Sequence, residues 1–265
     1  MHPLQLAMLS AVACVALLAA LGRLGFLHEE FGGRARRALA MLLLLAILTG
    51  CVFYPAVARD QSVMEPDTLW FPALFLGHFL FATFLLSWWR LRADISLVRL
   101  LHLDQLILDD LGSGIRFGCM GWVATMLVTA SVALLLQGAG AAGQTAELPP
   151  FMLWIAHLSL LRKLVVILVA MTVEEAFFRG FLQPRIGWIP SSLLFVLGHA
   201  SYGLPLMLVS VLVISLVLGW RFRQTQRLLP CIMAHGTFDA IQLLIVIPWA
   251  VHTLEGKPLR VLAGL

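Results

Sequence analysis

Two glutamates and an arginine interrupt an apolar run, Leu164 to Leu182, that is otherwise long enough to span a membrane. A charge near the bilayer centre costs about 2.5–3.5 kcal/mol, so this cluster needs a reason. Glu175 and Arg179 are four residues apart, so on a helix they share a face and neutralise each other. Glu174 lies about 100° further around the helix. We therefore predict that Glu175 and Arg179 form a buried brace and that Glu174 is available for chemistry.

Further ionisable side chains lie deep in two later apolar runs. His199 follows Phe195 by four residues, and Asp239 follows His235 by four residues, so each pair shares a helical face. With a rise of about 1.5 Å per residue, Glu174, His199 and His235 lie roughly 16, 14 and 9 Å from the inferred cytoplasmic ends of their spans. Three helices are therefore expected to bring polar groups to one layer in the cytoplasmic half of the membrane.

A carboxylate with two imidazoles suits the activation of water. Desolvation raises the pKa of a glutamate toward the range of a general base, so Glu174 is the candidate base, with His199 sharing or relaying the proton. His235 would donate a hydrogen bond to the oxyanion, and Asp239 would orient His235 or hold it protonated. The same four side chains, Glu174, His199, His235 and Asp239, would also suit a zinc ion with an open position, so a divalent metal is an alternative.

The three motifs, in this order on successive membrane segments, resemble the CAAX prenyl protease and bacteriocin-processing family. These intramembrane endopeptidases include the Ras-converting enzyme, and the resemblance covers about residues 149–250. It implies that Glu174 activates water, that Glu175 and Arg179 complete the first motif, and that His199 is the histidine of the second. It also implies that His235 stabilises the oxyanion. Phe195, in the second motif, is a candidate for substrate contact.

The last motif position departs from the family, because many members have asparagine where this chain has Asp239. An ionised aspartate cannot donate to an oxyanion. The residue is therefore expected to be protonated, to serve His235, or to bind a metal. The family's mechanism has been argued both as glutamate-dependent and as zinc-type, and the sequence leaves both open.

The composition is that of a membrane protein. The 265 residues are 61% hydrophobic and 12% charged, with a mean hydropathy of +0.95. Because the apolar runs are continuous and not alternating, we predict an all-α, polytopic membrane helical bundle and exclude a barrel. The net charge of +4 is expected to mark cytoplasmic loops and not nucleic-acid binding. The four cysteines lack a metal-type spacing and are expected to be small buried side chains.

About eight spans are predicted, with both termini outside according to the distribution of basic residues. They cover about Leu4–Leu21, Leu39–Ala56, Leu69–Trp89, Phe117–Leu136, Leu164–Leu182, Pro190–His199, 205–220 and Leu229–Val251. We divide the chain into N-terminal helices (1–148), a protease core (149–250) and a short tail (251–265).

Within residues 90–116, helical spacing predicts an amphipathic helix over 94–111 on the cytoplasmic surface. Asp109 and Asp110 are interpreted as its solvated end before a turn at Gly112-Ser113-Gly114. His78, His102, His157 and His252 are interpreted as interfacial or packing histidines.

The expected partners are the bilayer and a protein or peptide with a hydrophobic or lipidated terminus. The absence of asparagine suggests a GC-rich bacterial genome, hence an inner-membrane protein that processes hydrophobic leader or sorting segments in preference to prenylated tails. The alternatives are a non-catalytic scaffold or immunity protein and, with less support, a proton-coupled transporter, in which intramembrane Glu, His and Asp also occur. There is no H-E-x-x-H or G-x-G-D motif to support another type of intramembrane protease.

Overall fold

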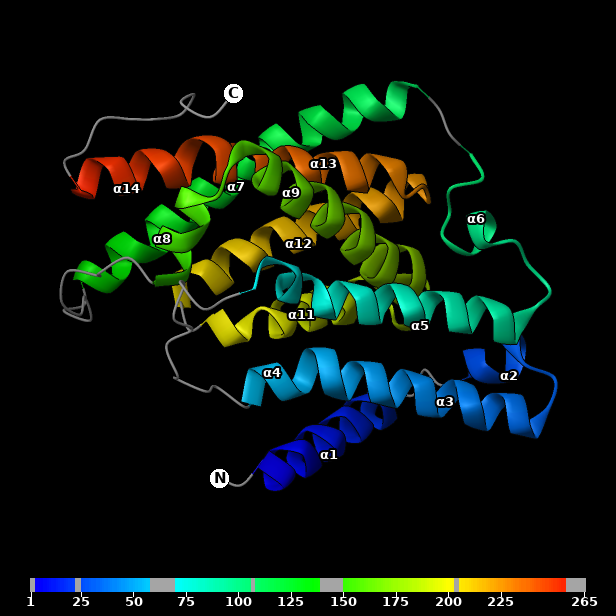
Figure 1. Cartoon of the computed structure of the whole chain (residues 1–265). Coiled ribbons are helices and arrows are strands. Elements are labelled where there is room, and N and C mark those ends of the chain that lie inside the picture. Colours follow the sequence, from blue (N-terminus) through cyan, green and yellow to red (C-terminus); the bar gives the residue numbers. More distant parts are fainter. Residues whose placement is uncertain are drawn as a thin grey trace.

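A computed structural model of the chain describes residues 3–21, 25–57, 70–105, 108–138, 150–202 and 205–255. Throughout these ranges the regular structure is helical and includes no strand, so the prediction of an all-α bundle is confirmed. The helices pack side by side, with α1 and α3 along one side of the bundle and α13 and α14 along the other (Figure 1). The predicted loops at 58–69 and 139–149 and the tail from 256 lie outside the described residues.

The N-terminal half supplies two long helices that reach the second half. Its elements are α1 (Pro3–Leu21), α2 (Phe26–Glu30), α3 (Arg34–Leu48), the π-helical η1 (Thr49–Phe53), α4 (Tyr54–Val57), η3 (Phe71–Phe75), α5 (Leu76–Arg92), α6 (Leu97–Leu100) and α7 (Asp109–Gly138). Of these, α5 packs on α9, and α7 packs on α12 and α13.

The C-terminal half carries the three motifs. Its elements are α8 (Pro150–His157), α9 (Leu160–Glu175), the π-helical η4 (Ala176–Leu182), α10 (Gln183–Ile186), α11 (Trp188–Gly198), η5 (Ala200–Tyr202), α12 (Pro205–Thr225), α13 (Leu229–Ile241), the π-helical η6 (Gln242–Val246) and α14 (Ile247–Glu255). Ser159 is the N-cap of α9, because its side chain accepts a hydrogen bond from the Arg162 backbone N–H.

The prediction of about eight spans is not confirmed. In the described part of the chain, five helical segments are long and apolar enough to cross a membrane: Arg34–Val57, Phe71–Arg92, Asp109–Gly138, Pro205–Thr225 and Leu229–Thr253. The helices over Gln5–Ala19 and Trp188–Gly198 are apolar but shorter. The helical segment that begins at Leu160 continues to Ile186 and is therefore long enough to cross a membrane. It is not among the five because it carries the charged residues of the first motif.

The continuous amphipathic helix expected over 94–111 is wrong for the described residues. Here α5 ends at Arg92, its C-cap residue Ala93 has a left-handed φ of 61°, and only the one-turn α6 follows before His102, whose φ is 55°. Left-handed residues end helices, so Ala93 ends α5 just before the predicted helix, and His102 interrupts that helix. The expected turn at Gly112-Ser113-Gly114 lies instead inside α7.

Asp110 is not a solvated helix end. The residue is 1% exposed, and its two carboxylate oxygens accept hydrogen bonds from Arg227 at 2.7 and 2.8 Å. Because Asp110 is in the first turn of α7 and Arg227 lies between α12 and α13, the ion pair fastens the start of α7 to the start of α13.

Glycines allow α7 and α13 to approach closely. A Cβ atom added at Gly118 would lie 2.6 Å from the Ala234 carbonyl oxygen, and one at Gly114 would lie 2.8 Å from the Pro230 carbonyl oxygen. Small residues at helix contacts are typical of membrane bundles. Because Ala234 directly precedes His235, this contact determines where the third motif lies.

Aromatic contacts set the register of α5 against the first motif. The ring centroids of Phe81 and Phe177 are 4.2 Å apart in a stacked pair, and those of Phe84 and Phe181 are 5.0 Å apart. Trp88 also contacts Phe181, at 4.8 Å. Residue numbers rise together along both helices, so α5 and α9 run parallel, as Figure 1 shows.

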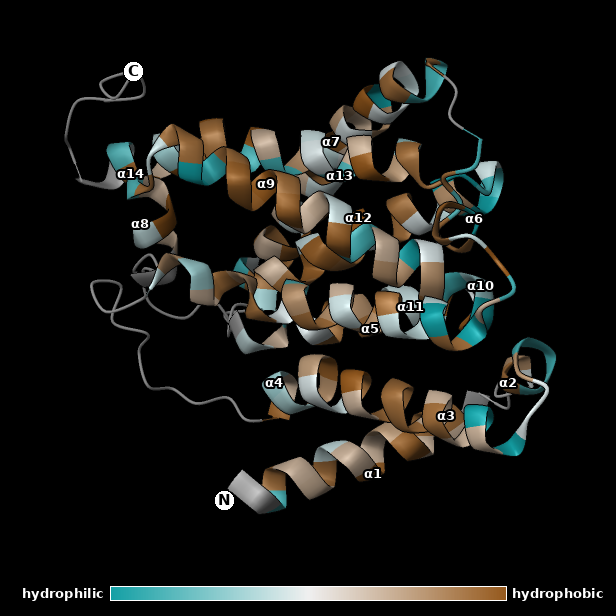
Figure 2. Ribbon diagram, turned by 45° about the vertical axis from the view of Figure 1, so that its right-hand side comes forward, coloured by the Kyte–Doolittle hydropathy of each residue, from teal (hydrophilic) through white to brown (hydrophobic). Residues whose placement is uncertain are grey.

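Polar residues gather at one end of the bundle, around α2, α6, α10 and the start of α3 (Figure 2). At this end Glu30 lies 2.8 Å from Arg185 and 3.4 Å from Arg92, and it accepts a hydrogen bond from the Trp88 indole. Through Glu30, Arg185 of α10 is thereby connected to Trp88 and Arg92 at the end of α5.

Candidate active site

Glu175 is the buried centre of the motif residues. Its Oε1 accepts hydrogen bonds from Arg179 Nη1 and from His235 Nδ1, both at 2.9 Å, and the residue is 0% exposed. The pairing with Arg179 is the one that the spacing of four residues predicts. The contact with His235 was not predicted, and it joins the first motif directly to the third.

Arg179 lies in a π-helical segment, η4, that begins directly after Glu175. Its Nη2 donates to the carbonyl and the hydroxyl oxygen of Ser215 at 3.2 and 3.0 Å, and its guanidinium lies 4.4 Å from the centre of the Phe195 ring. Insertions of π-helix are frequent at functional sites, because the wider turn redirects side chains. Arg179 therefore braces α9, α11 and α12 around the site.

Phe195 is 2% exposed, and its ring is covered by Arg179, by Phe178 at 5.0 Å and by His199 at 4.6 Å. This burial gives Phe195 a packing role and does not favour the substrate contact for which it was a candidate.

Glu174 faces away from this brace, toward α5. His78 Nε2 lies 3.0 Å from Glu174 Oε1, and the two side chains are 19% and 13% exposed. From the sequence, His78 is interpreted as an interfacial or packing histidine, whereas the structure places it against Glu174. The residue lies in the site, because the aromatic register of α5 brings it level with Glu174.

A depth estimate would have found His78. It precedes Arg90, the inferred cytoplasmic end of its span, by a distance of about 18 Å at 1.5 Å per residue. That depth matches the roughly 16 Å estimated for Glu174. The available signal was therefore depth in the membrane, since no motif spacing connects the two residues.

His199 lies at the end of α11, where its Nδ1 donates to the Phe195 carbonyl oxygen at 2.8 Å. This bond assigns the proton of the neutral ring to Nδ1. His199 is close enough to Glu174, His235 and His78 to interact with all three electrostatically. The structure therefore brings the histidine of the second motif into the same cluster as Glu174.

Asp239 lies on the other side of His235, with Oδ2 3.4 Å from Nε2. The imidazole of His235 is thus placed between two carboxylates, with the nearer contact to Glu175. Of the three expectations for Asp239, this placement suits the one in which it serves His235.

The residues predicted as zinc ligands are not arranged as a metal site. Over the ranges that the structure describes, no three His, Cys, Asp or Glu side chains are placed to hold a metal ion together. Glu174 is turned toward His78, while His235 lies between Glu175 and Asp239. The donor types suit zinc, but their positions in the described structure do not form a zinc site.

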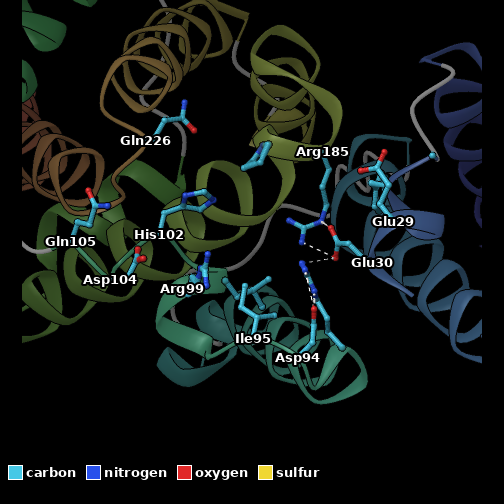
Figure 3. A pocket seen from close by; sticks show the side chains of 15 residues that line it. Glu29, Glu30, Asp94, Ile95, Arg99, His102, Asp104, Gln105, Arg185 and Gln226 are labelled. Atoms are coloured by element: carbon cyan, nitrogen blue, oxygen red, sulfur yellow. Dashed lines mark hydrogen bonds and ion pairs between the residues drawn. The ribbon is translucent and has the colours of Figure 1, made fainter. Parts of the chain in front are cut away.

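A cavity of about 960 Å³ lies outside this cluster, at the polar end of the bundle (Figure 3). Figure 3 shows Glu30 between Arg185 and a second basic side chain, with His102 and Arg99 on the opposite wall. None of the motif residues lines this cavity. Arg185 lines this cavity and lies on the same helical segment as Glu174.

Comparison with known proteins agrees with the motifs. Residues 155–241 match the profile of the family described as type II CAAX prenyl endopeptidase Rce1-like. The matched segment contains Glu174, Glu175, Arg179, His199, His235 and Asp239 and excludes His78. No curated protein and no solved structure matches the chain significantly. The segment that carries the polar cluster is therefore similar to the CAAX prenyl endopeptidase family.

Proposed function

We propose that this protein hydrolyses a peptide bond near the hydrophobic or lipidated terminus of a membrane-associated protein, with water activated by Glu174. The observation that carries the proposal is that two adjacent carboxylates have different surroundings. Glu175 is fully buried and paired with Arg179 and His235, whereas Glu174 is partly exposed and turned to another helix. A brace needs a neutralised charge, while a general base needs a carboxylate that reaches water.

The reaction follows from these positions. Glu174 takes one proton from water while the water oxygen forms a bond to the scissile carbonyl carbon. His199, whose Nδ1 is held by the Phe195 carbonyl, has Nε2 as the nitrogen that relays this proton. The proton reaches the leaving amine as the carbon–nitrogen bond breaks, and the products are a new carboxyl terminus and a new amino terminus.

His235 stabilises the oxyanion of the tetrahedral intermediate. Its Nδ1 is committed to Glu175, so Nε2, which has only the longer contact of 3.4 Å to Asp239, is the nitrogen that donates to the substrate. In the doubly protonated ring both nitrogens donate. Asp239 sets the direction of Nε2 and does not itself contact the oxyanion.

We further propose that the polar end of the bundle faces the cytoplasm of a bacterium and that the substrate enters from this side. The basic residues that end α5 and α12 support this orientation. Hydrophobic leader or sorting segments are the favoured substrates, and prenylated tails are the second class.

The test is cleavage by purified protein in lipid nanodiscs of a prenylated CAAX peptide and, separately, of a membrane-anchored peptide with a hydrophobic terminus. In ¹⁸O-labelled water, hydrolysis places the label in the new carboxyl terminus. We expect Glu174→Gln to abolish cleavage with the fold intact, and a chelator to leave the wild-type rate unchanged. Loss on chelation with rescue by zinc would contradict the metal-independent mechanism. Full activity of Glu174→Gln would contradict the role of Glu174 and favour a scaffold function.

A further inference from the structure

His78 contributes to the site from outside the segment that carries the motifs. It lies in the first turn of α5, whereas the family match begins at residue 155. The two partners of the contact are separated by 96 positions in the chain, and their Nε2 and Oε1 atoms lie 3.0 Å apart. The contact therefore depends on the packing of α5 against α9 and not on any local motif.

Aromatic contacts along α5 position His78 relative to the first motif. One helical face of α5 carries His78, Phe81, Phe84 and Trp88 in turn, and the three aromatic side chains contact the rings of η4. Rings in such contacts add about 0.5–1.5 kcal/mol per pair beyond their burial. The three aromatic contacts thus fix the register of α5 against η4, and this register places His78 level with Glu174.

The hydrogen-bonding of His78 is one-sided. A carboxylate only accepts, so Nε2 donates to Glu174 and Nδ1 keeps the lone pair of the neutral ring. Nδ1 is buried and has no hydrogen-bond partner among the described residues. A histidine retained for stability alone would satisfy both nitrogens, because an unpaired buried polar atom costs about 1–3 kcal/mol.

Glu174 differs from Glu175 in how its charge is supported. Glu175 has an arginine on its own helix, whereas the ion-pair partner that the described residues offer Glu174 is His78. A donor to Oε1 fixes the rotation of the carboxylate and directs Oε2 to one place. A general base needs this, since a misplacement of about 1 Å can reduce a rate about 100-fold.

We propose that His78 is the positioning residue of the catalytic base: its Nε2–H holds Oε1 of Glu174 so that Oε2 meets the attacking water. This inference rests on the proposed function. It also makes the N-terminal helices part of the enzyme, since α5 supplies a side chain without which Glu174 is not oriented.

The experiment compares three substitutions at one position. The Nε2 of a glutamine side chain superimposes on Nε2 of histidine, so His78→Gln keeps the donor, whereas His78→Asn places its amide where Nδ1 was and His78→Leu removes both. Rates are measured over a range of substrate concentrations in nanodiscs, with the thermal midpoint of each variant. His157→Leu is the matched control, because His157 is exposed and donates a hydrogen bond to the carbonyl of Leu153 on its own helix.

We expect His78→Leu and His78→Asn to lower kcat about 100-fold with KM nearly unchanged. We expect the kcat of His78→Gln to be at least about tenfold higher than that of these two variants. His157→Leu is expected to behave as wild type. Equal kcat values for the Gln, Asn and Leu variants, whether high or low, would overturn the proposal. If His78→Leu does not fold, the Gln and Asn variants decide, as both are polar and smaller than histidine.

The outcome is separable from that of the proposed function. If Glu174→Gln is inactive while all His78 variants cleave normally, only the positioning role is wrong. If Glu174→Gln cleaves normally, the proposed function itself is wrong.

Discussion

His235 Nδ1 lies 2.9 Å from Glu175 Oε1, although sixty positions separate the two residues in the chain. The glutamate that neutralises Arg179 therefore also orients the imidazole proposed to bind the oxyanion. The second glutamate of the first motif consequently belongs to both the fold and the chemistry, whereas Glu174 serves the chemistry alone.

Replacing Glu175 is expected to damage stability more than replacing Glu174. In Glu175→Gln the buried guanidinium of Arg179 loses its charge partner, and breaking a buried pair costs about 3–5 kcal/mol. The free energy of unfolding in mixed detergent micelles measures this loss. Glu174→Gln, which leaves the brace intact, is the matched control and should remain near the wild-type stability. Equal stability of the two variants would show that Glu175 is not a brace.

Asp239→Asn restores the residue common in the resembled family. The contact to His235 is long, at 3.4 Å, and the nearer contact from Glu175 remains. We therefore expect kcat to change by less than about tenfold, the equivalent of about 1.4 kcal/mol, with the fold unchanged. A loss approaching that of Glu174→Gln would mean that the charge of Asp239 takes part directly in the reaction.

The close contact between α7 and α13 can be tested by replacing single glycines of α7 with alanine, which adds one methyl group. Gly118→Ala would place a Cβ atom 2.6 Å from the Ala234 carbonyl oxygen, so the helices must separate and His235 must move. Overpacking of this kind costs about 1–3 kcal/mol, and we expect lower kcat as well as lower stability. The thermal midpoint and the cleavage rate measure the two effects.

Gly112→Ala is the control for this substitution. Gly112 lies in the same helix, but a Cβ atom there would meet nothing within 4 Å. Alanine is the better helix former by about 1 kcal/mol, so this variant should be as stable as the wild type or more so. If Gly112→Ala and Gly118→Ala behave alike, the contact with α13 is not tight.

Acidification is expected to destabilise the polar end of the bundle through His102. Burial lowers the pKa of His102 below its ordinary value, and the charge of Arg185 acts in the same direction, whereas Asp104 and the Gln226 backbone oppose it. The unfolded chain therefore binds this proton more readily than the folded one, so stability present above about pH 6.5 is lost as the pH falls.

The measurement is the free energy of unfolding between about pH 5 and pH 8, compared with that of His102→Asn. Asparagine tolerates the left-handed backbone at this position, where φ is 55°, and does not titrate. We expect a shallower pH dependence in the variant. An unchanged slope would show that His102 is not the group responsible.

The sequence predicts those parts of the site that depend on spacing within one helix. The pair of Glu175 and Arg179 and the placement of Glu174 on another face both follow from helical geometry. Contacts between helices that are distant in the chain do not follow from this geometry. The sequence therefore does not predict the bonds from His235 to Glu175 and from His78 to Glu174. They depend on the register of packed helices, which periodicity cannot supply.

The errors in the fold have a similar origin. Apolar spacing at 94–111 resembled one helix, but the backbone turns left-handed at Ala93 and His102. Asp110 was assigned to solvent because its partner, Arg227, follows it by 117 positions. The apolar runs were recognised correctly as helices, while their number as full spans was not confirmed, because length and charge decide whether a helix can cross the bilayer.

The separation of His78 and Glu174 along the chain also sets the order in which the side chains of the site are synthesised. His78 leaves the ribosome 96 residues before Glu174, which at about 5–20 residues per second amounts to about 5–20 seconds. Glu174 in turn precedes the histidine of the third motif. Under the proposed function, the set of catalytic side chains is therefore complete only when α13 has been inserted.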